Sequence, residues 1–229
     1  MNSNCALITG SSDGLGMAMA LRFASQGWGV IVHGRDKDKV AAVGQEVARL
    51  GGRDFRVVGD ITDPSTIMML ASAASVNKAN LLINNVGIYT QRGIDSLKPG
   101  QVRYVFEVNL IAPVLLTKEV FEVFKISGSG MIININSVAG KVASPNEAIY
   151  CAGKHGLRGF MSSFKHEALK HNVSVLDIYF GAINTKMAEG RKDADKFISK
   201  EEAAELVLSL MGNYRTLRVS EIEVLRKIY

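Results

Sequence analysis

The stretch that decides the fold is CALITGSSDGLGMAMALRFASQG, residues 5–27. An apolar run leads into the glycine-rich turn TGSSDGLG, residues 9–16, and an amphipathic segment follows. Glycine permits a positive φ and lets the backbone approach a ligand closely. The start of the following helix offers free N–H groups and a partial positive charge, which suits a pyrophosphate. The stretch therefore predicts a strand–turn–helix unit of the kind that binds a dinucleotide.

Two other interpretations of this turn stay open. One is a tight connection between strand and helix that binds no ligand. The other is the nucleophile elbow G-x-S-x-G, which residues 10–14 match and which would make Ser12 a hydrolase nucleophile. That elbow is expected after several strands, with an acid and then a histidine downstream, whereas this turn follows the first strand. The chain contains no G-x-x-x-x-G-K-[ST] loop, so a P-loop nucleotidase is not supported.

Further along the chain, short runs rich in Val, Ile and Leu alternate with segments of helix length. Such runs are typical of strands that are buried on both faces of a parallel sheet. We expect an α/β fold with a single doubly wound parallel sheet, the Rossmann-type three-layer α/β/α sandwich. The expected strands are residues 5–9, 29–33, 55–58, 81–84, 131–136, 173–179 and 217–225; the expected helices are residues 17–27, 36–50, 63–76, 99 to about 124, 148–170 and 200–211.

Length and composition bound the domain organisation. The 229 residues are 47% hydrophobic and 21% charged, which argues against intrinsic disorder. Since no repeat, linker or composition break marks a second domain, residues 1–229 are expected to form one domain. The least periodic stretch, residues 181–199, follows a strand whose end lies at the ligand-binding edge, so it is expected to be a small substrate loop or lid.

Composition also disfavours several kinds of site and partner. Two cysteines cannot form a disulfide framework, and the four histidines show no metal-ligand spacing, so no metal site is expected. Without a bilayer-spanning apolar run or a secretory signal, the expected location is cytoplasmic, with no membrane partner. The net charge of +5 leaves anionic ligands open, but Arg215, Arg218, Arg226 and Lys227 lack interleaved aromatic residues, so nucleic-acid binding is not expected.

The end of the second strand separates the two nicotinamide dinucleotides. An acidic residue there accepts hydrogen bonds from the ribose 2′-OH, whereas a basic residue meets a 2′-phosphate. The chain reads His33-Gly34-Arg35-Asp36. Gly34 therefore stands where the acidic residue is expected, and the guanidinium of Arg35 suits a phosphate. Asp36 is better placed to cap the next helix. NADP(H) is therefore favoured, while NAD(H), with Asp36 on the ribose, stays possible.

A second constellation lies between residues 137 and 154. Tyr150 and Lys154 are four residues apart, which places both side chains on one face of the expected helix. Ser137 directly follows the strand 131–136 and so lies at the carboxyl edge of the sheet. A phenol with a pKa of about 10 is a poor acid or base at neutral pH, but a neighbouring ammonium favours the phenolate. With the glycine-rich turn, these three residues indicate proton-transfer chemistry beside a nucleotide.

Together these motifs resemble the short-chain dehydrogenase/reductase family over nearly the whole chain. Residues 9–16 are similar to the family's T-G-x-x-x-G-x-G turn, and residues 84–87 (NNVG) to its N-N-A-G motif, with Val86 in place of alanine. Residues 137, 150 and 154 match the catalytic serine, tyrosine and lysine, and residue 109 matches the helix asparagine. Residues 180–185 resemble the P-G-x-x-x-T stretch that flanks the nicotinamide, with Phe180 in place of a frequent proline.

The resemblance implies a mechanism in which hydride passes between the nicotinamide and a carbonyl or carbinol carbon. Ser137 would orient the substrate oxygen, and Tyr150 would act as general acid in reduction and as base in oxidation. Lys154 would hold the nicotinamide ribose and favour the phenolate, and Asn109 would position a water in a proton relay. Cofactor contacts are implied at Gly10, Ser12, Asp13, Leu15, Gly16, Arg35, Asp60, Ile61, Asn85, Val86, Gly87, Tyr150, Lys154, Ile183 and Thr185.

These motifs are specific for the family and not for the substrate. The expected function is an NADP(H)-dependent carbonyl reductase or alcohol dehydrogenase for a small molecule. Two alternatives stay open: a reductase of 3-oxoacyl thioesters of acyl carrier protein or CoA, and a catalytically silent cofactor-binding sensor, which the intact catalytic set disfavours. Gly153, Gly156 and Gly159 would permit close helix approach, so a homodimer or homotetramer is expected, with tight packing inside one subunit as the alternative.

Overall fold

The protein is described here by a computed structural model that places residues 4–188, 193, 196–211 and 217–227. The described strands form one parallel sheet in the order β3-β2-β1-β4-β5-β6-β7. The strands are β1 Cys5–Ile8, β2 Gly29–Gly34, β3 Asp54–Val58, β4 Leu81–Asn84, β5 Gly130–Ser137, β6 Val173–Phe180 and β7 Glu221–Val224. The helices are α1 Gly14–Ala24, α2 Lys37–Arg49, α3 Pro64–Val76, α4 Pro99–Phe106, α5 Ala112–Ser127, α6 Ala148–Leu169 and α7 Lys200–Ser209.

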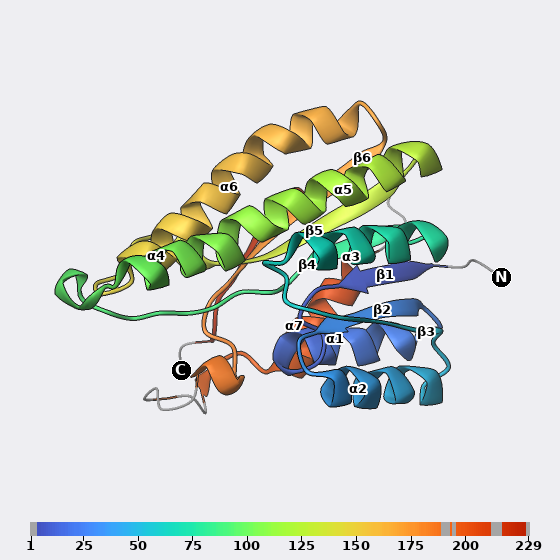
Figure 1. Ribbon diagram of the computed structural model, residues 1–229, viewed down its shortest axis with the longest axis horizontal. Coiled ribbons are helices and arrows are strands. Elements are labelled where there is room, and N and C mark those ends of the chain that lie inside the picture. The colour runs from blue at the N-terminus through green and yellow to red at the C-terminus, as the bar shows by residue number, and fades with distance from the viewer. Residues whose placement is uncertain (1–3, 189–192, 194–195, 212–216, 228–229) are drawn as a thin grey trace.

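The sheet lies between two layers of helices, which confirms the expected doubly wound fold. Helices α1, α2 and α7 cover one face, and α3, α5 and α6 cover the other (Figure 1). Side chains alternate between the two faces along each strand. The first core lies between the sheet and α1, α2 and α7, and the second lies between the sheet and α3, α5 and α6. In β1, Ala6 and Ile8 pack in the first core, while Cys5 and Leu7 pack in the second. Both faces of the central strands are therefore buried, which explains why their sequences are apolar throughout.

Most element boundaries agree with the sequence, and those of α1 and β7 differ for local reasons. Helix α1 spans residues 14–24 instead of 17–27, because Asp13 caps its N-terminus from inside the glycine-rich turn. Strand β7 is confined to residues 221–224, since this edge strand pairs with β6 only over residues 177–180. The expected cap at Asp36 is confirmed, because its carboxylate accepts hydrogen bonds from the N–H groups of residues 38 and 39, and Asp63 caps α3 by accepting from the N–H of Ser65.

The expected helix from residue 99 to about 124 is interrupted. Between α4 and α5, residues Glu107–Ile111 form a π-helical turn. A continuous α-helix would need the N–H of residue 113 to donate to the carbonyl of Asn109, and Pro113 has no N–H. Single π turns of this kind often occur at functional sites. Asn109, one of the expected site residues, lies within this turn.

A chain of buried polar side chains crosses the strands that carry the site. Asn84, Asn134 and Asp177 occupy matching positions on β4, β5 and β6. Asn84 Nδ2 donates to Asn134 Oδ1 at 2.9 Å, and Asn134 Nδ2 donates to Asp177 Oδ1 at 3.0 Å. Lys165, on α6, places its Nζ 3.7 Å from Asp177 Oδ2. Because these hydrogen bonds form only in this register, they disfavour slippage of the strands.

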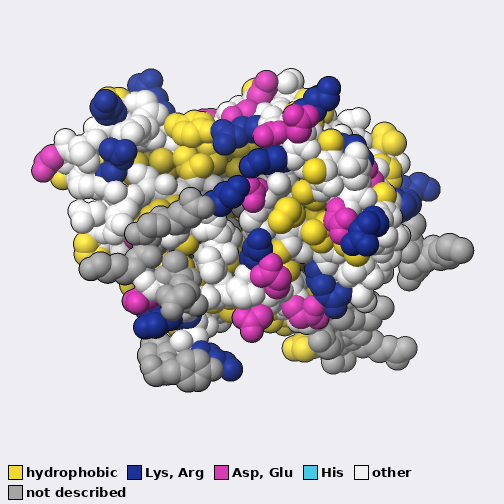
Figure 2. Space-filling view, turned by 90° about the horizontal axis from the view of Figure 1, so that it is seen from below, with side chains coloured by type: hydrophobic (Ala, Val, Ile, Leu, Met, Phe, Trp, Pro, Cys, Tyr) yellow, Lys and Arg dark blue, Asp and Glu magenta, His cyan; other side chains and the backbone are white. Residues whose placement is uncertain are grey.

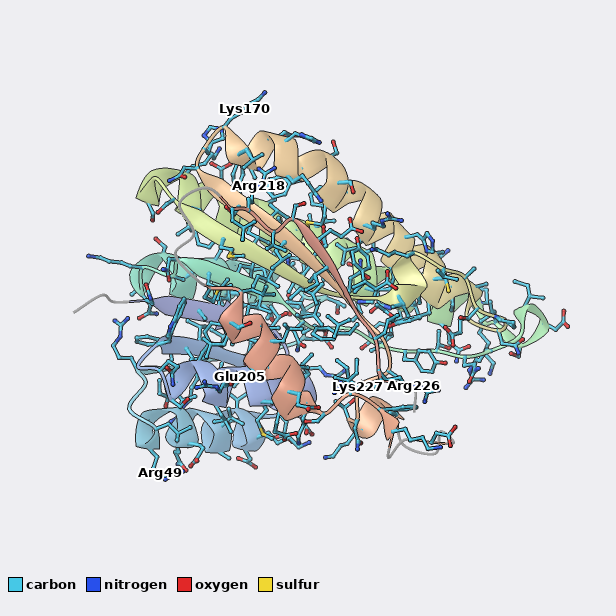
Figure 3. The ribbon with its side chains drawn as sticks, turned by 180° about the vertical axis from the view of Figure 1, so that it is seen from behind. Arg49, Lys170, Glu205, Arg218, Arg226 and Lys227 are labelled. Carbon is cyan, nitrogen blue, oxygen red and sulfur yellow. The ribbon has the colours of Figure 1, made fainter. Side chains whose placement is uncertain are left out.

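The described outer surface carries charges of both signs. Figure 2 shows lysine and arginine side chains next to aspartates and glutamates on the face seen from below. Figure 3 places Arg218 at one end of β7 and both Arg226 and Lys227 at the other, so these basic residues do not form one cluster. Arg215 lies outside the described residues. Among the helices that the structure describes, none is long and apolar enough to cross a bilayer.

Candidate active site

The expected site residues gather at the carboxyl edge of the sheet, where β1 pairs with β2 on one side and β4 on the other. In an open α/β sheet this reversal of strand order is where ligands bind. A cavity of about 510 Å³ opens there. Apart from Asn109, every residue predicted for the site lines it: Gly10, Ser12, Asp13, Leu15, Gly16, Arg35, Asp60, Ile61, Asn85, Val86, Gly87, Ser137, Tyr150, Lys154, Ile183 and Thr185.

The glycine-rich turn needs glycine at several positions. Gly10 and Gly14 have φ of 64° and 58°, a region that side chains rarely adopt. A Cβ on Gly16 would overlap the carbonyl oxygen of Gly10, so the first turn of α1 packs directly on the turn before it. The first α-helical hydrogen bond runs from the N–H of Met17 to the carbonyl of Asp13. The N–H groups of residues 15 and 16 come before it, so they can donate hydrogen bonds to an anion.

The end of β2 lies against this turn. A Cβ on Gly34 would overlap Ser12 Oγ, so only glycine leaves room for that serine. The backbone N–H of Gly10 donates to His33 Nδ1 at 3.1 Å, which assigns the ring proton to Nε2, 3.2 Å from the carbonyl oxygen of Gly59. Burial lowers the pKa of His33 to about 4, so the ring is neutral and serves as a fixed link between the turn, β2 and β3.

Arg35 lies over the end of the cavity formed by β2 and β3. Its Nη1 is 3.6 Å from Asp60 Oδ2 and donates to Tyr104 Oη at 3.3 Å. Asp60 also accepts two hydrogen bonds from Thr62. Although burial raises the pKa of Asp60, the Thr62 bonds and the charge of Arg35 hold it below its ordinary value. The side chain of Arg35 is mostly exposed, so its guanidinium can also bind an anion that enters the cavity.

The segment after β4 is fastened to the glycine-rich turn. Asn85 Nδ2 donates to the carbonyl of Thr9 at 2.8 Å, and Thr9 Oγ1 accepts from the backbone N–H groups of residues 85 and 86. Val86, which stands where the family usually has alanine, places a methyl group 3.0 Å from the position of a Cβ on Gly10. The larger side chain therefore packs against the turn and leaves less space for any side chain at residue 10.

Ser137 is the last residue of β5, at the rim of the cavity. Its N–H donates to Asn136 Oδ1 at 2.9 Å, and its Oγ accepts from the N–H of Ala139 at 3.2 Å. The hydroxyl proton is left to donate to another acceptor. Asn136 Nδ2 also approaches the carbonyl of Lys154 at 3.4 Å, which joins the end of β5 to α6.

Tyr150 lies on the first turn of α6 and is 8% exposed. Its ring contacts that of Tyr89 edge to face, with centroids 5.1 Å apart. Tyr89 Oη donates to Glu147 Oε1 at 2.6 Å, and Glu147 is three residues before Tyr150 on the chain. A backbone bond from Arg92 to the carbonyl of Asn146 joins the same two segments. The tyrosine ring is thus held by the segment that follows β4.

Lys154 is almost fully buried on the same helical face. Its Nζ lies 3.4 Å from the carbonyl oxygen of Ile135 and close to the backbone of Gly87. Burial lowers the pKa of Lys154 to about 8. Among the described residues no carboxylate forms an ion pair with it, and burial alone shifts its pKa. The ammonium therefore keeps donors for a ligand in the cavity.

Asn109 does not line the cavity, but it supports the wall. Its side chain donates to the carbonyl of Ile88 at 2.8 Å and accepts from the N–H of Ile88 at 2.9 Å. A Cβ on Gly87 would lie 3.3 Å from Asn109 Oδ1 and 3.5 Å from Lys154 Nζ. A Cβ on Gly153 would lie 3.3 Å from that of Asn109. Both polar atoms of the amide are engaged by the main chain, so the side chain acts on the site through residues 87 and 88.

The glycines of α6 have different surroundings. Gly153 and Gly156 face the π-helical turn of the same chain, where Asn109 and Leu110 approach them. A Cβ on Gly159 would have no neighbour within 4 Å among the described residues. Close packing inside one subunit therefore accounts for two of the three glycines.

The start of the expected substrate loop lies on the glycine-rich turn. Thr185 Cγ2 is 3.7 Å from the position of a Cβ on Gly14. Ile183 and Ile198 form an isolated β-bridge, which closes the base of the loop. Phe180, in place of the family's frequent proline, is 2% exposed and packs in the first core. Residues 189–192 and 194–195 of the expected lid lie outside the described residues.

The structure adds site residues that the sequence did not single out. Tyr104 and Lys186 line the cavity next to Arg35 and Asp13, and Tyr89 packs on Tyr150. Proximity to the N-N-V-G motif is a signal that could have suggested Tyr89. No motif marks Tyr104 or Lys186, because their contacts depend on how distant segments fold together.

The cavity fits a nicotinamide dinucleotide. Its glycine-lined start suits a pyrophosphate, Asp60 and Ile61 lie at the end toward β3, and Ser137, Tyr150 and Lys154 lie at the other end. Among the described residues there is no group of three His, Cys, Asp or Glu side chains that could hold a metal ion.

Comparison with known proteins agrees with this geometry. A family model described as short chain dehydrogenase matches residues 4–196. The D-beta-hydroxybutyrate dehydrogenase of Rhizobium meliloti is 31% identical over 235 residues, which cover 91% of this chain and 91% of that protein. The 3-oxoacyl-[acyl-carrier-protein] reductase of Synechocystis is 32% identical over 192 residues, which cover 82% of this chain and 78% of that protein.

Solved structures share the fold. A metagenomic short-chain oxidoreductase in complex with NADP superposes with a TM-score of 0.85 at 28% identity, covering 99% of this chain and 98% of that one. An alcohol dehydrogenase from the archaeon Thermococcus sibiricus, complexed with 5-hydroxy-NADP, gives a TM-score of 0.91 and covers 100% of this chain and 98% of that one. At 22% identity, this second likeness shows the fold alone.

Proposed function

Because the chain belongs to the short-chain dehydrogenase family, whose members are oxidoreductases of alcohol and carbonyl groups, we propose that it is an NADP(H)-dependent reductase in which Ser137, Tyr150 and Lys154 carry the chemistry. The observation that carries this proposal is the meeting of these three side chains with the glycine-rich turn in one cavity. Two separate segments of the chain thus supply a nucleotide cradle and a proton donor to the same space.

The residues that would hold the cofactor follow the cavity from end to end. The turn at residues 10–16 would take the pyrophosphate, and Asp60 with Ile61 would take the adenine. Arg35, with Gly34 where an acid would otherwise stand, supports NADP over NAD. The NADP in the related metagenomic oxidoreductase also favours this choice. Lys154 would hold the nicotinamide ribose with its spare ammonium donors.

Proton transfer is assigned to Tyr150. When bound, the nicotinamide supplies the hydride or accepts it. In reduction, Tyr150 Oη gives its proton to the substrate oxygen, and Ser137 Oγ donates a hydrogen bond to the same oxygen to orient it. The Lys154 ammonium, one turn along α6, stabilises the phenolate that remains. Burial of both side chains strengthens this charge interaction, because the surroundings are less polarisable than water.

A reductase of 3-oxoacyl thioesters is a second candidate, supported by the Synechocystis relative. The Rhizobium meliloti relative, by its name, acts on another β-oxygenated acyl compound. Both relatives are consistent with a substrate that carries its carbonyl group at the third carbon of an acyl chain. The choice between a free acid, a thioester and an unrelated ketone rests on the substrate panel described below.

We further propose a cytoplasmic enzyme that forms a homodimer or homotetramer. Both cysteines, Cys5 and Cys151, are free and buried, as is common in a reducing compartment. Tyr104, Ile111 and Leu115 are exposed apolar side chains on α4, the π-helical turn and α5, and they offer a surface for a second copy. Light scattering coupled to size-exclusion chromatography measures the oligomeric state directly.

The proposed function is tested by following NADPH oxidation with a panel of ketones, 3-oxoacids and 3-oxoacyl thioesters, with NADH as the control. We expect turnover with at least one carbonyl class and a preference for NADPH. Tight NADPH binding without turnover on any compound would instead indicate a sensor. A preference for NADH would overturn the role given to Arg35.

A further inference from the structure

Two lysines beside the proposed cofactor site share one carboxylate oxygen. Lys39 Nζ lies 3.0 Å from Asp13 Oδ2, and Lys186 Nζ lies 3.1 Å from the same atom. Lys39 comes from α2, whereas Lys186 comes from the segment after β6. Because both ammonium groups contact a single oxygen, they are close enough to share another anion in its place.

The backbone around Lys186 is well held. Residues Lys186–Ala188 form a 3₁₀ turn, which the N–H of Ala188 closes by donating to the carbonyl of Thr185 at 2.8 Å. The base of the segment is fixed by a 2.8 Å bond from the N–H of Asn184 to the carbonyl of Ile198. The contact of Thr185 with the Gly14 position then sets this turn directly on the glycine-rich turn.

The shared carboxylate lies where a ribose would be recognised. Asp13 follows Ser12, whose side chain packs on Gly34 at the end of β2. Arg35 directly follows Gly34, and the ribose hydroxyls of a dinucleotide are recognised at this strand end. Asp13 and Lys186 both line the cavity with Arg35. A phosphate on the ribose 2′-oxygen would therefore approach Arg35 and the two lysines together.

The ion pairs of Asp13 are suited to exchange. The side chains of Lys39, Asp13 and Lys186 are 48%, 40% and 68% exposed. Ion pairs exposed to this degree contribute little to stability, so they are easily replaced. A phosphate monoester carries about −1.5 to −2 charges and three acceptor oxygens, so it competes well for the same ammonium groups. The two lysines hold the pKa of Asp13 at about 2, so the carboxylate is charged at neutral pH.

We propose that Lys39 and Lys186 form, with Arg35, the recognition site for the 2′-phosphate of the cofactor, and that Asp13 is the anion which this phosphate replaces. The proposal rests on the NADP preference given above and adds two lysines to it. NAD has no 2′-phosphate, so it leaves the Asp13 ion pairs in place. With NADP, Lys186 also ties the segment after β6 to the bound nucleotide, which couples the loop to the choice of cofactor.

The experiment measures dissociation constants for NADPH and NADH by nicotinamide fluorescence, and for 2′,5′-ADP and 5′-AMP by calorimetry. The variants are Lys39→Met, Lys186→Met, Lys186→Arg and Asp13→Asn. Lys196→Met is the matched control, because Lys196 lies in the same segment, is 66% exposed and pairs with Asp193. The two adenosine phosphates test the 2′-phosphate site without any contribution from the nicotinamide.

We expect each lysine-to-methionine variant to weaken NADPH and 2′,5′-ADP binding about five- to tenfold, while NADH and 5′-AMP change less than about twofold. Lys186→Arg should restore most of the loss. Asp13→Asn keeps the capping oxygen and removes the competing charge, so it should tighten NADPH binding about two- to fivefold and NADH binding less. The control should bind all four ligands as the unaltered protein does.

Two contrary results are distinguishable. If the unaltered protein prefers NADPH but Lys39→Met and Lys186→Met weaken NADPH and NADH equally, or neither, the role of the two lysines is refuted and the proposed function stands. If the unaltered protein prefers NADH, the cofactor choice within the proposed function fails, and this inference fails with it.

Discussion

Replacing Lys154 with methionine should stabilise the protein while it removes activity. The ammonium is almost fully buried, and burial lowers its pKa from the ordinary 10.5 to about 8. At about 1.4 kcal/mol per pH unit, keeping this lysine charged at neutral pH costs about 3 kcal/mol of folding free energy. Methionine has a similar length and no charge. Since it loses the bond to Ile135, we expect a net gain of about 1–3 kcal/mol at pH 7.

The gain should depend on pH in a definite direction. Native Lys154 releases its proton near pH 8, whereas the unfolded chain holds it up to about pH 10.5. Between these values the unfolded state binds more protons, so the free energy of unfolding of the unaltered protein rises with pH through this site. Lys154→Met has no such contribution, so its advantage should shrink between pH 8 and 10.5. Urea unfolding at pH 7 and pH 10, followed by circular dichroism, measures both values.

Lys165→Met is the matched contrast, because Lys165 is a second, largely buried lysine on α6. Its Nζ lies 3.7 Å from Asp177, which is fully buried. Removing it leaves that carboxylate without its charge partner, so we expect a loss of about 3 kcal/mol. The reasoning about Lys154 is refuted if Lys154→Met is less stable than the unaltered protein at pH 7, or if its advantage is the same at pH 10.

Three further predictions concern packing. Gly16→Ala should abolish NADPH binding and lower the free energy of unfolding by more than about 2 kcal/mol, measured by fluorescence and urea titration, because its Cβ would overlap the carbonyl of Gly10. Gly159→Ala, where the Cβ meets open space, should instead stabilise α6 by about 1 kcal/mol; a loss of stability would show that this face is covered. Tyr89→Phe removes the 2.6 Å bond to Glu147 and keeps the ring on Tyr150, so kcat should fall a few-fold with an unchanged Kd for NADPH, and unchanged kcat would exclude a positioning role.

Much of the fold was predictable because it depends on local patterns. Apolar runs separated by helix-length segments predict strands buried on both faces, and the structure contains them. Ser137 and Arg35 could be placed together because the carboxyl ends of parallel strands share one edge, whereas Asp60 was implied by the family resemblance. Tyr150 and Lys154 followed from helical spacing. Their catalytic roles stay predictions until the variants are measured.

Other parts of the site depend on tertiary placement. The bond between Arg35 and Tyr104 joins residues 69 positions apart, and the ion pair of Asp13 with Lys186 spans 173 positions. No periodicity or motif reports such contacts. The π-helical turn at Glu107–Ile111 also escaped prediction, although Pro113 marks the point where a continuous α-helix loses a donor. The burial of Lys154, with no acidic partner in the part of the chain that the structure describes, likewise follows only from the packing of α6 on β5.

The central claim is that Tyr150 transfers the proton in an NADPH-dependent reduction, and Tyr150→Phe tests it most directly. The measurement compares turnover of the best carbonyl substrate from the panel with NADPH affinity in the same variant. We predict that kcat falls about 100- to 10,000-fold while the Kd for NADPH stays within about twofold, because the ring remains packed on Tyr89 and the hydroxyl that carries the acidic proton is lost. Near-normal turnover in Tyr150→Phe would contradict the account.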